Sequence, residues 1–572
     1  MNTLKTINDY LYKYREQGHS VREVLQNCLN TSVSFDDKNI WITKADMAFL
    51  EPYFLRLEKC NPYSLPLYGV PFAVKDNIDV MGLPTTAGCA EFSYLPNEHA
   101  FVVEQLINAG AVPIGKTNLD QFATGLVGTR SPYGEGINLF DPEYISGGSS
   151  SGSALAVTAG IVPFSLGTDT AGSGRVPAAF GNIVGLKPTR GALSIRGVVP
   201  ACKSLDCVAI FAQTCDDAQD VYDLCSQYDP EDSHSRAKST INSFGESFRF
   251  GVPRANQLEF FGNNAYKTLF WESVERLEGL GGSRVEIDFT PFMDTAKLLY
   301  HGPWIAERYC GIKEFAMTQS DAMLEVTRGI VLSGTIPSAI DAFEGFYRLS
   351  DLKRISDEIM KTIDFLVTPT AGTIYTREEV RNNPLELNTN LGYYTNFMNL
   401  LDLCAYAVPA GFTQEGLPFG ITLAAPAWSE HSLLNIGTKF CAKRETVLLA
   451  VCGAHMSGLP LNHELTTKGA KLVEKTFTAA LYRFFAIESF TPPRPGLVKI
   501  NETGGSIEVE VWEVPSESFG AFFNGVPSPL ALGTLTLIDG KTVKGFMCES
   551  YATEGAREIT KLGGWRSYLA TR

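Results

Sequence analysis

The chain has 572 residues, of which 44% are hydrophobic and 19% charged, and its formal net charge is −15. This length exceeds one ordinary hydrophobic core, so we expect two or more domains, and the negative charge argues against nucleic acid or an anionic membrane as a partner. The 12 cysteines are scattered without metal-ligand spacing, which favours reduced thiols, a cytoplasmic location and no bound metal. No run of about 18 apolar residues is present, so no membrane-spanning helix is expected.

Residues 1–60 carry apolar side chains at helical spacing, such as Ile7 and Leu11, and we expect two or three amphipathic helices there. The apolar run from Val70 to Val74 then predicts a buried strand that leads directly into Lys75. A lysine in that position is usually a surface residue whose stem packs on apolar neighbours. If it is buried instead, its pKa falls and the amine can act as a neutral base.

Residues 110–117 match the spacing of a phosphate-binding P-loop, Gly110-x4-Gly115-Lys116-Thr117. A P-loop runs from strand through loop to helix, whereas here a helical pattern (102–108) precedes a strand-like run (111–114). Pro113 also removes one of the main-chain N–H groups that such a loop needs. We therefore interpret this segment as a helix–strand unit of an α/β fold.

Residues 147–177 contain two clusters of Gly and Ser separated by a small apolar segment, which predicts a helix over 154–160 and a strand over 161–166. A flexible linker lacks such a segment. The two clusters therefore lie in loops that the helix–strand unit can bring face to face. Successive main-chain N–H groups from Thr170 through Ala171 and Gly172 are candidates to stabilise an oxyanion.

Gly148-x-Ser150-x-Gly152 also matches the nucleophile elbow of α/β hydrolases. That motif requires a strand immediately before it, and residues 138–145 are typical of a loop. The chain has only seven histidines, none within a local catalytic signature. A Ser-His-Asp enzyme is therefore the weaker alternative.

Alternating helical and strand-like patterns over residues 1–455 predict an α/β domain with a mixed sheet flanked by helices. Residues 456–475 are polar and are expected to form a linker. Over 476–572, short apolar or alternating runs are separated by turns such as Asp539-Gly540. This pattern predicts a second, smaller and β-rich domain.

Two stretches, GGSSSGS (147–153) and GTDTAGSGRVP (167–177), closely resemble the signature of the amidase signature family, GGSSGGS followed by GTDTGGSIRxP. The differences, at Ser151, Ala171 and Gly174, exchange one small residue for another or a bulkier residue for a small one. The family cleaves amides with a Ser–cis-Ser–Lys triad and no cofactor. The resemblance implies that Lys75 is the base, that Ser149 is the bridging serine after a cis peptide bond, and that Ser173 is the nucleophile.

Within that family the chain is similar to the allophanate hydrolase branch, in stretches spread over nearly its full length: 120–134, 299–309, 409–428, 492–497, 509–515 and 563–569. This resemblance implies that Tyr300 and Arg308 bind the substrate carboxylate, with Gly125 also in the binding site. The spacing of eight between Tyr300 and Arg308 places them about two turns apart on one helical face. An intrahelical ion pair with a nearby acid is the ordinary alternative for Arg308.

The implied reaction is hydrolysis of the terminal amide of allophanate (urea-1-carboxylate), which releases ammonia and N-carboxycarbamate. In this branch the C-terminal domain resembles the γ-glutamyl cyclotransferase-like fold and promotes decarboxylation, so that two ammonium and two carbon dioxide result. His463 is the acid–base candidate for that step, although it is equally compatible with a solvent-exposed linker histidine. The family often forms dimers and acts after urea carboxylase, which we expect on a separate chain.

Two alternatives remain open. An amidase of other specificity, including the glutaminase subunit of a tRNA-dependent amidotransferase, would share Lys75, Ser149 and Ser173 but lack the Tyr300–Arg308 pair and the C-terminal domain. A non-catalytic binding or scaffold protein would keep the fold, but the complete triad argues against it.

Overall fold

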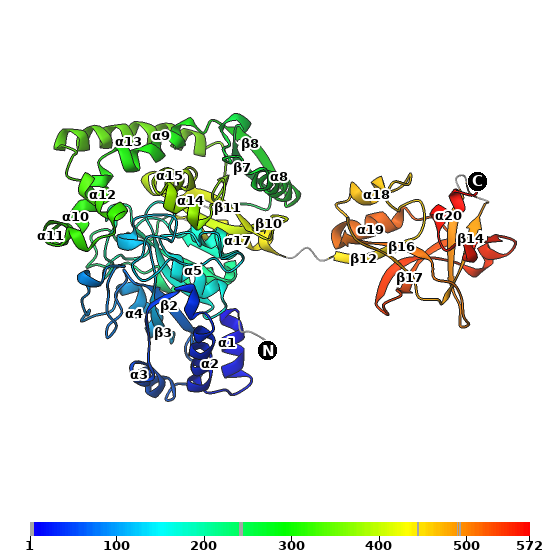
Figure 1. Ribbon diagram of the computed structural model, residues 1–572, viewed down its shortest axis with the longest axis horizontal. Coiled ribbons are helices and arrows are strands. Elements are labelled where there is room, and N and C mark those ends of the chain that lie inside the picture. Colours follow the sequence, from blue (N-terminus) through cyan, green and yellow to red (C-terminus); the bar gives the residue numbers. More distant parts are fainter. Residues whose placement is uncertain (1–4, 240–243, 443–445, 489, 491–492) are drawn as a thin grey trace. The chain divides into compact units, whose positions relative to one another are not determined.

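The computed structural model describes residues 5–239, 244–442, 446–488, 490 and 493–572 (Figure 1). Its contacts divide the chain into two compact units, Met1–Cys441 and Ala442–Arg572. Each unit has its own hydrophobic core.

The first unit is built on an 11-stranded mixed sheet with the order β1-β3-β2-β4-β6-β5-β10-β11-β9-β7-β8. Strands β3, β2 and β4 are parallel to one another, as are β9, β7 and β8, and the strands from β4 through β11 to β9 pair antiparallel. The strands are β1 (Trp41–Lys44), β2 (Pro71–Lys75), β3 (Val112–Thr117), β4 (Phe164–Asp169), β5 (Val184–Lys187), β6 (Cys207–Ala212), β7 (Phe248–Pro253), β8 (Gly282–Ile287), β9 (Phe365–Pro369), β10 (Leu403–Phe412) and β11 (Pro418–Pro426).

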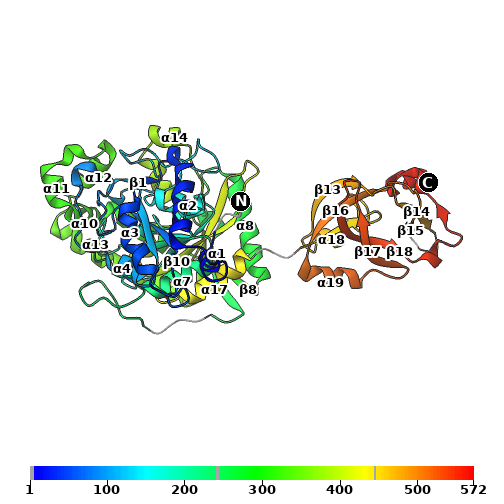
Figure 2. The same cartoon turned by 90° about the horizontal axis from the view of Figure 1, so that it is seen from below.

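Helices surround this sheet, and Figure 2 shows α1, α2 and α3 together beside its N-terminal strands. The helices are α1 (Ile7–Arg15), α2 (Val21–Val33), α3 (Met47–Leu57), α4 (Phe101–Asn108), α5 (Ser151–Thr158), α6 (Val176–Phe180), α7 (Cys215–Cys225), α8 (Asn264–Gly279), α9 (Thr290–His301), α10 (Trp304–Gly311), α11 (Lys313–Thr318), α12 (Glu325–Ser333), α13 (Ala339–Met360), α14 (Arg377–Asn382), α15 (Glu386–Leu391), α16 (Phe397–Leu400) and α17 (Glu430–Cys441). The predicted mixed α/β sheet with flanking helices is confirmed.

The helix–strand unit predicted between the two Gly/Ser clusters is present as α5 and β4, each shifted by a few residues. Strand β4 lies parallel to β2, with Val74 opposite Leu166. Because parallel strands end at the same edge of a sheet, Lys75 at the end of β2 lies beside the end of β4. The rejected P-loop is a strand, since Gly115, Lys116 and Thr117 all belong to β3.

The second unit is β-rich, with sheet orders β13-β16-β12-β18-β17 and β15-β14-β19. Its core gathers buried aliphatic and aromatic side chains such as Leu449, Phe484 and Trp565. Its elements are β12 (Thr446–Val451), α18 (His463–Thr466), β13 (Lys471–Phe477), β14 (Tyr482–Ile487), β15 (Arg494–Lys499), β16 (Glu508–Pro515), α19 (Ser516–Asn524), β17 (Leu530–Thr536), β18 (Thr542–Cys548), β19 (Arg557–Glu558) and α20 (Trp565–Leu569).

The domain boundary predicted at residue 455 differs from the division that the contacts make after Cys441. Strand β12 pairs with β16 and β18, so residues 446–451 belong to the second unit. The segment 456–475, expected as a linker, contains α18 and the start of β13. Polar composition was misleading here, because β13 is an edge strand whose side chains are largely exposed. Within the part of the chain that the structure describes, no helix is long and apolar enough to cross a membrane.

This division predicts how truncated chains behave. A chain ending at residue 441 keeps the whole first unit, and we expect it to unfold in one cooperative transition and stay monodisperse. A chain ending at residue 455 keeps β12 without its partners β16 and β18, which leaves Leu449 and Val451 uncovered. We expect the longer fragment to aggregate more readily in size-exclusion chromatography. Equal behaviour of the two fragments would contradict the boundary.

Candidate active site

Lys75 is fully buried at the end of β2. Its Nζ lies 2.8 Å from Ser149 Oγ and 2.7 Å from Thr168 Oγ1. A hydroxyl both donates and accepts, so either contact can pass a proton to or from the amine. The surface-lysine alternative is therefore wrong, and Thr168 is a second partner that the sequence analysis did not identify.

Burial lowers the pKa of Lys75 from 10.5 to about 7, because the water-excluded interior disfavours the charged amine. The carboxylates of Asp120, Asp206 and Asp169 act in the opposite direction, and the positive charge of Arg308 adds to the lowering. The amine is thus poised to exist in its neutral, proton-accepting form near neutral pH.

The peptide bond between Gly148 and Ser149 is cis. Ser149 lies just before α5, and its carbonyl accepts a hydrogen bond of 3.0 Å from the main-chain N–H of Asp120. A Cβ at position 148 would lie 2.2 Å from Asp120 Oδ2, so only glycine fits there. Asp120 therefore packs directly against the segment that presents Ser149 to Lys75.

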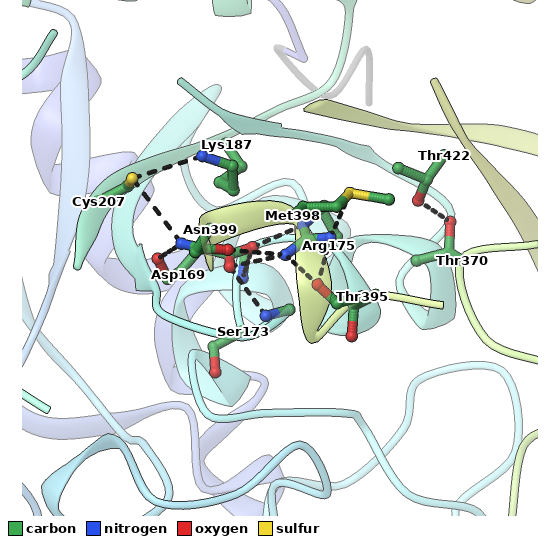
Figure 3. A network of polar contacts seen from close by, with 12 residues as sticks. Asp169, Ser173, Arg175, Lys187, Cys207, Thr370, Thr395, Met398, Asn399 and Thr422 are labelled. Atoms are coloured by element: carbon green, nitrogen blue, oxygen red, sulfur yellow. Dashed lines mark hydrogen bonds and ion pairs between the residues drawn. The ribbon is translucent and has the colours of Figure 1, made fainter. Parts of the chain in front are cut away.

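The loop that carries Ser173 is wrapped around the carboxylate of Asp169 (Figure 3). Asp169 accepts the main-chain N–H groups of Gly172 (2.8 Å) and Gly174 (3.0 Å), and two bonds of 2.9 Å from the guanidinium of Arg175. Both side chains of this ion pair are fully buried. The side chain of Ser173 points away from this network in Figure 3, so the ion pair shapes the loop while leaving the hydroxyl free of it.

This network corrects one of the oxyanion predictions. The N–H of Gly172 donates to Asp169, and that group is therefore not available to a reaction intermediate. Over the described residues, the main-chain N–H groups of Thr170, Ala171 and Ser173 have no recorded hydrogen bond. Thr170 and Ala171 thus remain predicted oxyanion donors.

Ser173 Oγ donates a hydrogen bond of 3.4 Å to the carbonyl of Gly125. Within the described residues, no hydrogen bond is recorded between Ser173 and Ser149. The Lys75–Ser149 half of the predicted relay is thus a direct contact, and the Ser149–Ser173 half stays a prediction. Gly125 contributes its carbonyl to the site and has a φ of +151°, in a region that favours glycine.

Tyr300 and Arg308 lie on different helices, so the prediction that they share one helical face is wrong. Helix α9 ends at His301, and α10 starts at Trp304 after Gly302 and Pro303. Proline cannot continue the first helix, which is the physical reason for the break. Arg308 is 4% exposed and donates a hydrogen bond of 2.9 Å to Thr124 Oγ1 rather than to an acid on its own helix.

A cavity of about 360 Å³ borders this region, and Tyr300 and Arg130 line it. Arg130 donates to the carbonyl of Thr124, next to Gly125. Arg130 lies within the stretch 120–134 that carries the family resemblance, but it was not among the predicted site residues.

A second cavity, of about 190 Å³, lies in the C-terminal unit and is lined by His455, Glu464 and Arg494 among others. His455 Nε2 lies 3.1 Å from Glu464 Oε2, and its ring stacks on Phe546. Burial lowers the pKa of His455 below its usual value. The predicted candidate, His463, is exposed, contacts the carbonyl of Pro460 and does not line this cavity.

Comparison with known proteins defines the class. An Amidase family model matches residues 54–434, and the chain belongs to that family. A second model, Allophanate hydrolase C-terminal domain, matches residues 447–570, which agrees with the division seen in the structure.

Allophanate hydrolase from Kluyveromyces lactis is 40% identical, with each chain covering 99% of the other and a TM-score of 0.73. Urea amidolyase from Saccharomyces cerevisiae is 41% identical over 99% of this chain, which spans about a third (33%) of that relative's length. A glutamyl-tRNA(Gln) amidotransferase subunit from Methanosarcina acetivorans is 34% identical, over 70% of this chain and 89% of its own.

The buried amine predicts a pH dependence for amide hydrolysis. Lys75 is protonated below its pKa of about 7, and a protonated amine cannot accept a proton. We expect kcat/KM to fall about tenfold per pH unit below this value and to level off above it. Asp120→Asn removes a charge that favours protonated Lys75, and this should move the acid limb to lower pH. An acid limb that is the same in both proteins would contradict this role of Asp120.

Proposed function

We propose that this chain is an allophanate hydrolase that works in two steps, one in each unit. The observation that carries the proposal is full-length similarity: 40% identity to an allophanate hydrolase extends over 99% of both chains. The buried Lys75–Ser149 contact supports an amide-cleaving first step.

In the first step, neutral Lys75 takes the proton of Ser149 while Ser149 takes that of Ser173, which attacks the amide carbon of allophanate. Main-chain N–H groups of Thr170 and Ala171 stabilise the oxyanion. The relay returns the proton to the departing ammonia, and water then cleaves the acyl-enzyme to give N-carboxycarbamate. No histidine is needed, because burial lowers the pKa of Lys75 to about 7, so the amine is partly neutral at a pH where a free lysine is protonated.

The substrate carboxylate is bound by Arg308 and Tyr300. Arg308 is buried beside Thr124, one residue from the carbonyl that Ser173 contacts. A guanidinium suits a planar carboxylate because its N–H donors can bond both oxygens.

In the second step, the C-terminal unit promotes decarboxylation of N-carboxycarbamate, so that two ammonium and two carbon dioxide are formed. We assign the acid–base role to His455 in place of His463, because His455 lines a cavity with a carboxylate partner and a nearby guanidinium. The similarity of this unit to the γ-glutamyl cyclotransferase-like fold stays a prediction.

We further propose that a urea carboxylase supplies the allophanate in the cytoplasm; the S. cerevisiae relative, of which this chain spans about a third, is a urea amidolyase. A homodimer is the proposed assembly. The first turns of helix α13 carry three apolar side chains that are each 60–70% exposed, those of Ile340, Phe343 and Tyr347. Exposed apolar side chains of this kind are typical of a surface that self-associates. Sedimentation equilibrium tests this assembly, and a monomer at micromolar concentration would contradict it.

An amidase of other specificity, or a glutaminase component of an amidotransferase, is disfavoured because the amidotransferase relative matches only 70% of this chain. A non-catalytic protein would not need a lysine buried against a serine. Labelling of Ser173 by a fluorophosphonate probe, absent in Ser173→Ala, separates an enzyme from such a binding protein.

The function is tested by an ammonia assay with allophanate, malonamate, biuret and glutamine as substrates. We expect the largest kcat/KM with allophanate, and loss of at least about a thousandfold in both Lys75→Ala and Ser173→Ala because the nucleophile is no longer activated. A preference for glutamine would favour the amidotransferase alternative. Near-normal activity in either variant would remove the mechanism.

The second step gives a separate prediction. His455→Ala should leave the first ammonia release intact and slow carbon dioxide formation, whereas His463→Ala, its matched control, should change neither. Parallel ammonia and carbon dioxide assays measure both products. Equal slowing of carbon dioxide by both variants would contradict the assignment of His455, and loss of both products together would contradict the division into two steps.

A further inference from the structure

Three arginines lie buried around the amidase site, and they differ in what they contact. Arg175 is fully buried and forms an ion pair with Asp169. Arg130 and Arg308 are 5% and 4% exposed, and within the described part of the chain neither forms an ion pair with a carboxylate. A buried charge without a counter-ion is costly, so two such guanidiniums in one place need an explanation.

The recorded contacts of Arg130 are all with neutral groups. Its Nη1 donates to the carbonyl of Thr124 at 3.0 Å and its Nη2 to that of Pro384 at 2.6 Å, while Nε is buried without a partner. A guanidinium has five N–H donors, so this side chain retains unused donors. It lines the 360 Å³ cavity together with Tyr300.

Arg308 also contacts Thr124, because its Nη1 donates a hydrogen bond to the Thr124 side chain, whereas Arg130 bonds the Thr124 carbonyl. The next carbonyl along the chain, that of Gly125, accepts the hydrogen bond of Ser173. Two guanidiniums therefore both bond Thr124, the residue that precedes the one contacted by Ser173. Burial lowers the pKa of Arg130, and the positive charge of Arg308 contributes to that lowering.

The nearby acids are already engaged elsewhere. Asp120 accepts the main-chain N–H groups of Val127, Gly128 and Arg130. Asp206 accepts the Thr170 hydroxyl and the N–H groups of Ala201 and Cys202. These carboxylates offset the field of the arginines without contacting their guanidinium groups.

We propose that Arg130 is a specificity-determining residue that binds the substrate carboxylate together with Arg308. The ligand class is a short amide that carries one carboxylate at its far end. The inference rests on the proposed function, because it identifies what the amidase site selects. A purely structural role, in which Arg130 only ties Thr124 to Pro384, predicts equal losses for charged and uncharged ligands.

The test measures binding by calorimetry in a Ser173→Ala background, so that no ligand is consumed. Malonamate and malonamide form a matched pair, since they differ only by carboxylate against carboxamide. We expect Arg130→Gln to weaken malonamate binding about 10- to 100-fold, the range for a lost charge-assisted hydrogen bond, and malonamide binding less than about threefold. Arg381→Gln, an exposed arginine paired with Glu135, is the control and should change neither.

Arg130→Lys keeps the positive charge but lacks the planar set of N–H donors of a guanidinium. We expect this variant to lose part of the affinity for malonamate and to keep its affinity for malonamide. This variant decides the question if Arg130→Gln does not fold. Equal weakening of both ligands, no change in either, or no preference for malonamate before Arg130 is altered overturns the inference. Failure of the unsubstituted chain to hydrolyse allophanate, with the charge preference of Arg130 intact, would overturn the proposed function alone.

Discussion

The chemistry of the site depends on the placement of one amine where water cannot reach it. Lys75 ends a fully buried strand, and the interior disfavours its charged form enough to bring its pKa to about 7. The carboxylates of Asp120, Asp206 and Asp169 oppose this lowering, so the amine is more basic than burial alone would leave it. The site therefore combines two opposing effects, and the balance places the lysine in the range where histidine usually works.

A second constraint, the Asp169–Arg175 ion pair, determines the shape of the loop that carries Ser173. Breaking a buried pair is strongly destabilising, so the pair resists rearrangement of the loop. Arg175 also bonds the carbonyl of Thr395, and Asn399 donates to the carbonyl of Asp169, which fixes the loop to the α16 region (Figure 3). The glycine at position 172 is required because its φ is +139° and a Cβ would lie 2.4 Å from Thr395 Oγ1. The ion pair thus holds Ser173, the proposed nucleophile, in position without touching its side chain.

Sequence reasoning succeeded where a local pattern determines local structure. The α5–β4 unit followed from apolar periodicity, and the contact of Lys75 with Ser149 agrees with the roles that the family signature implies. Sequence reasoning failed where a contact made only in the folded chain determines the role of a group. Nothing in the sequence indicates that the N–H of Gly172 is occupied. In the folded loop this N–H donates to the Asp169 carboxylate. The helix break before Arg308 had a local signal, Gly302-Pro303, that the spacing argument overlooked.

The same contrast explains the C-terminal unit. His463 and His455 are close in sequence, and no local pattern distinguishes them. The pairing of β12 with β16 shows that residues from 446 onward belong to the second unit, and His455 lines the cavity of that unit.

The net charge of the chain does not describe the charge at the amidase site. The chain as a whole carries −15, yet the buried Arg130 lines the 360 Å³ cavity, and the buried Arg308 contacts Thr124, which Arg130 also contacts. Salt screens exposed charges over roughly 8 Å, whereas charges in a water-excluded site are screened much less. The proposed carboxylate-binding pair, Arg130 and Arg308, would therefore act locally whatever the net charge, and an anionic substrate is compatible with an acidic protein.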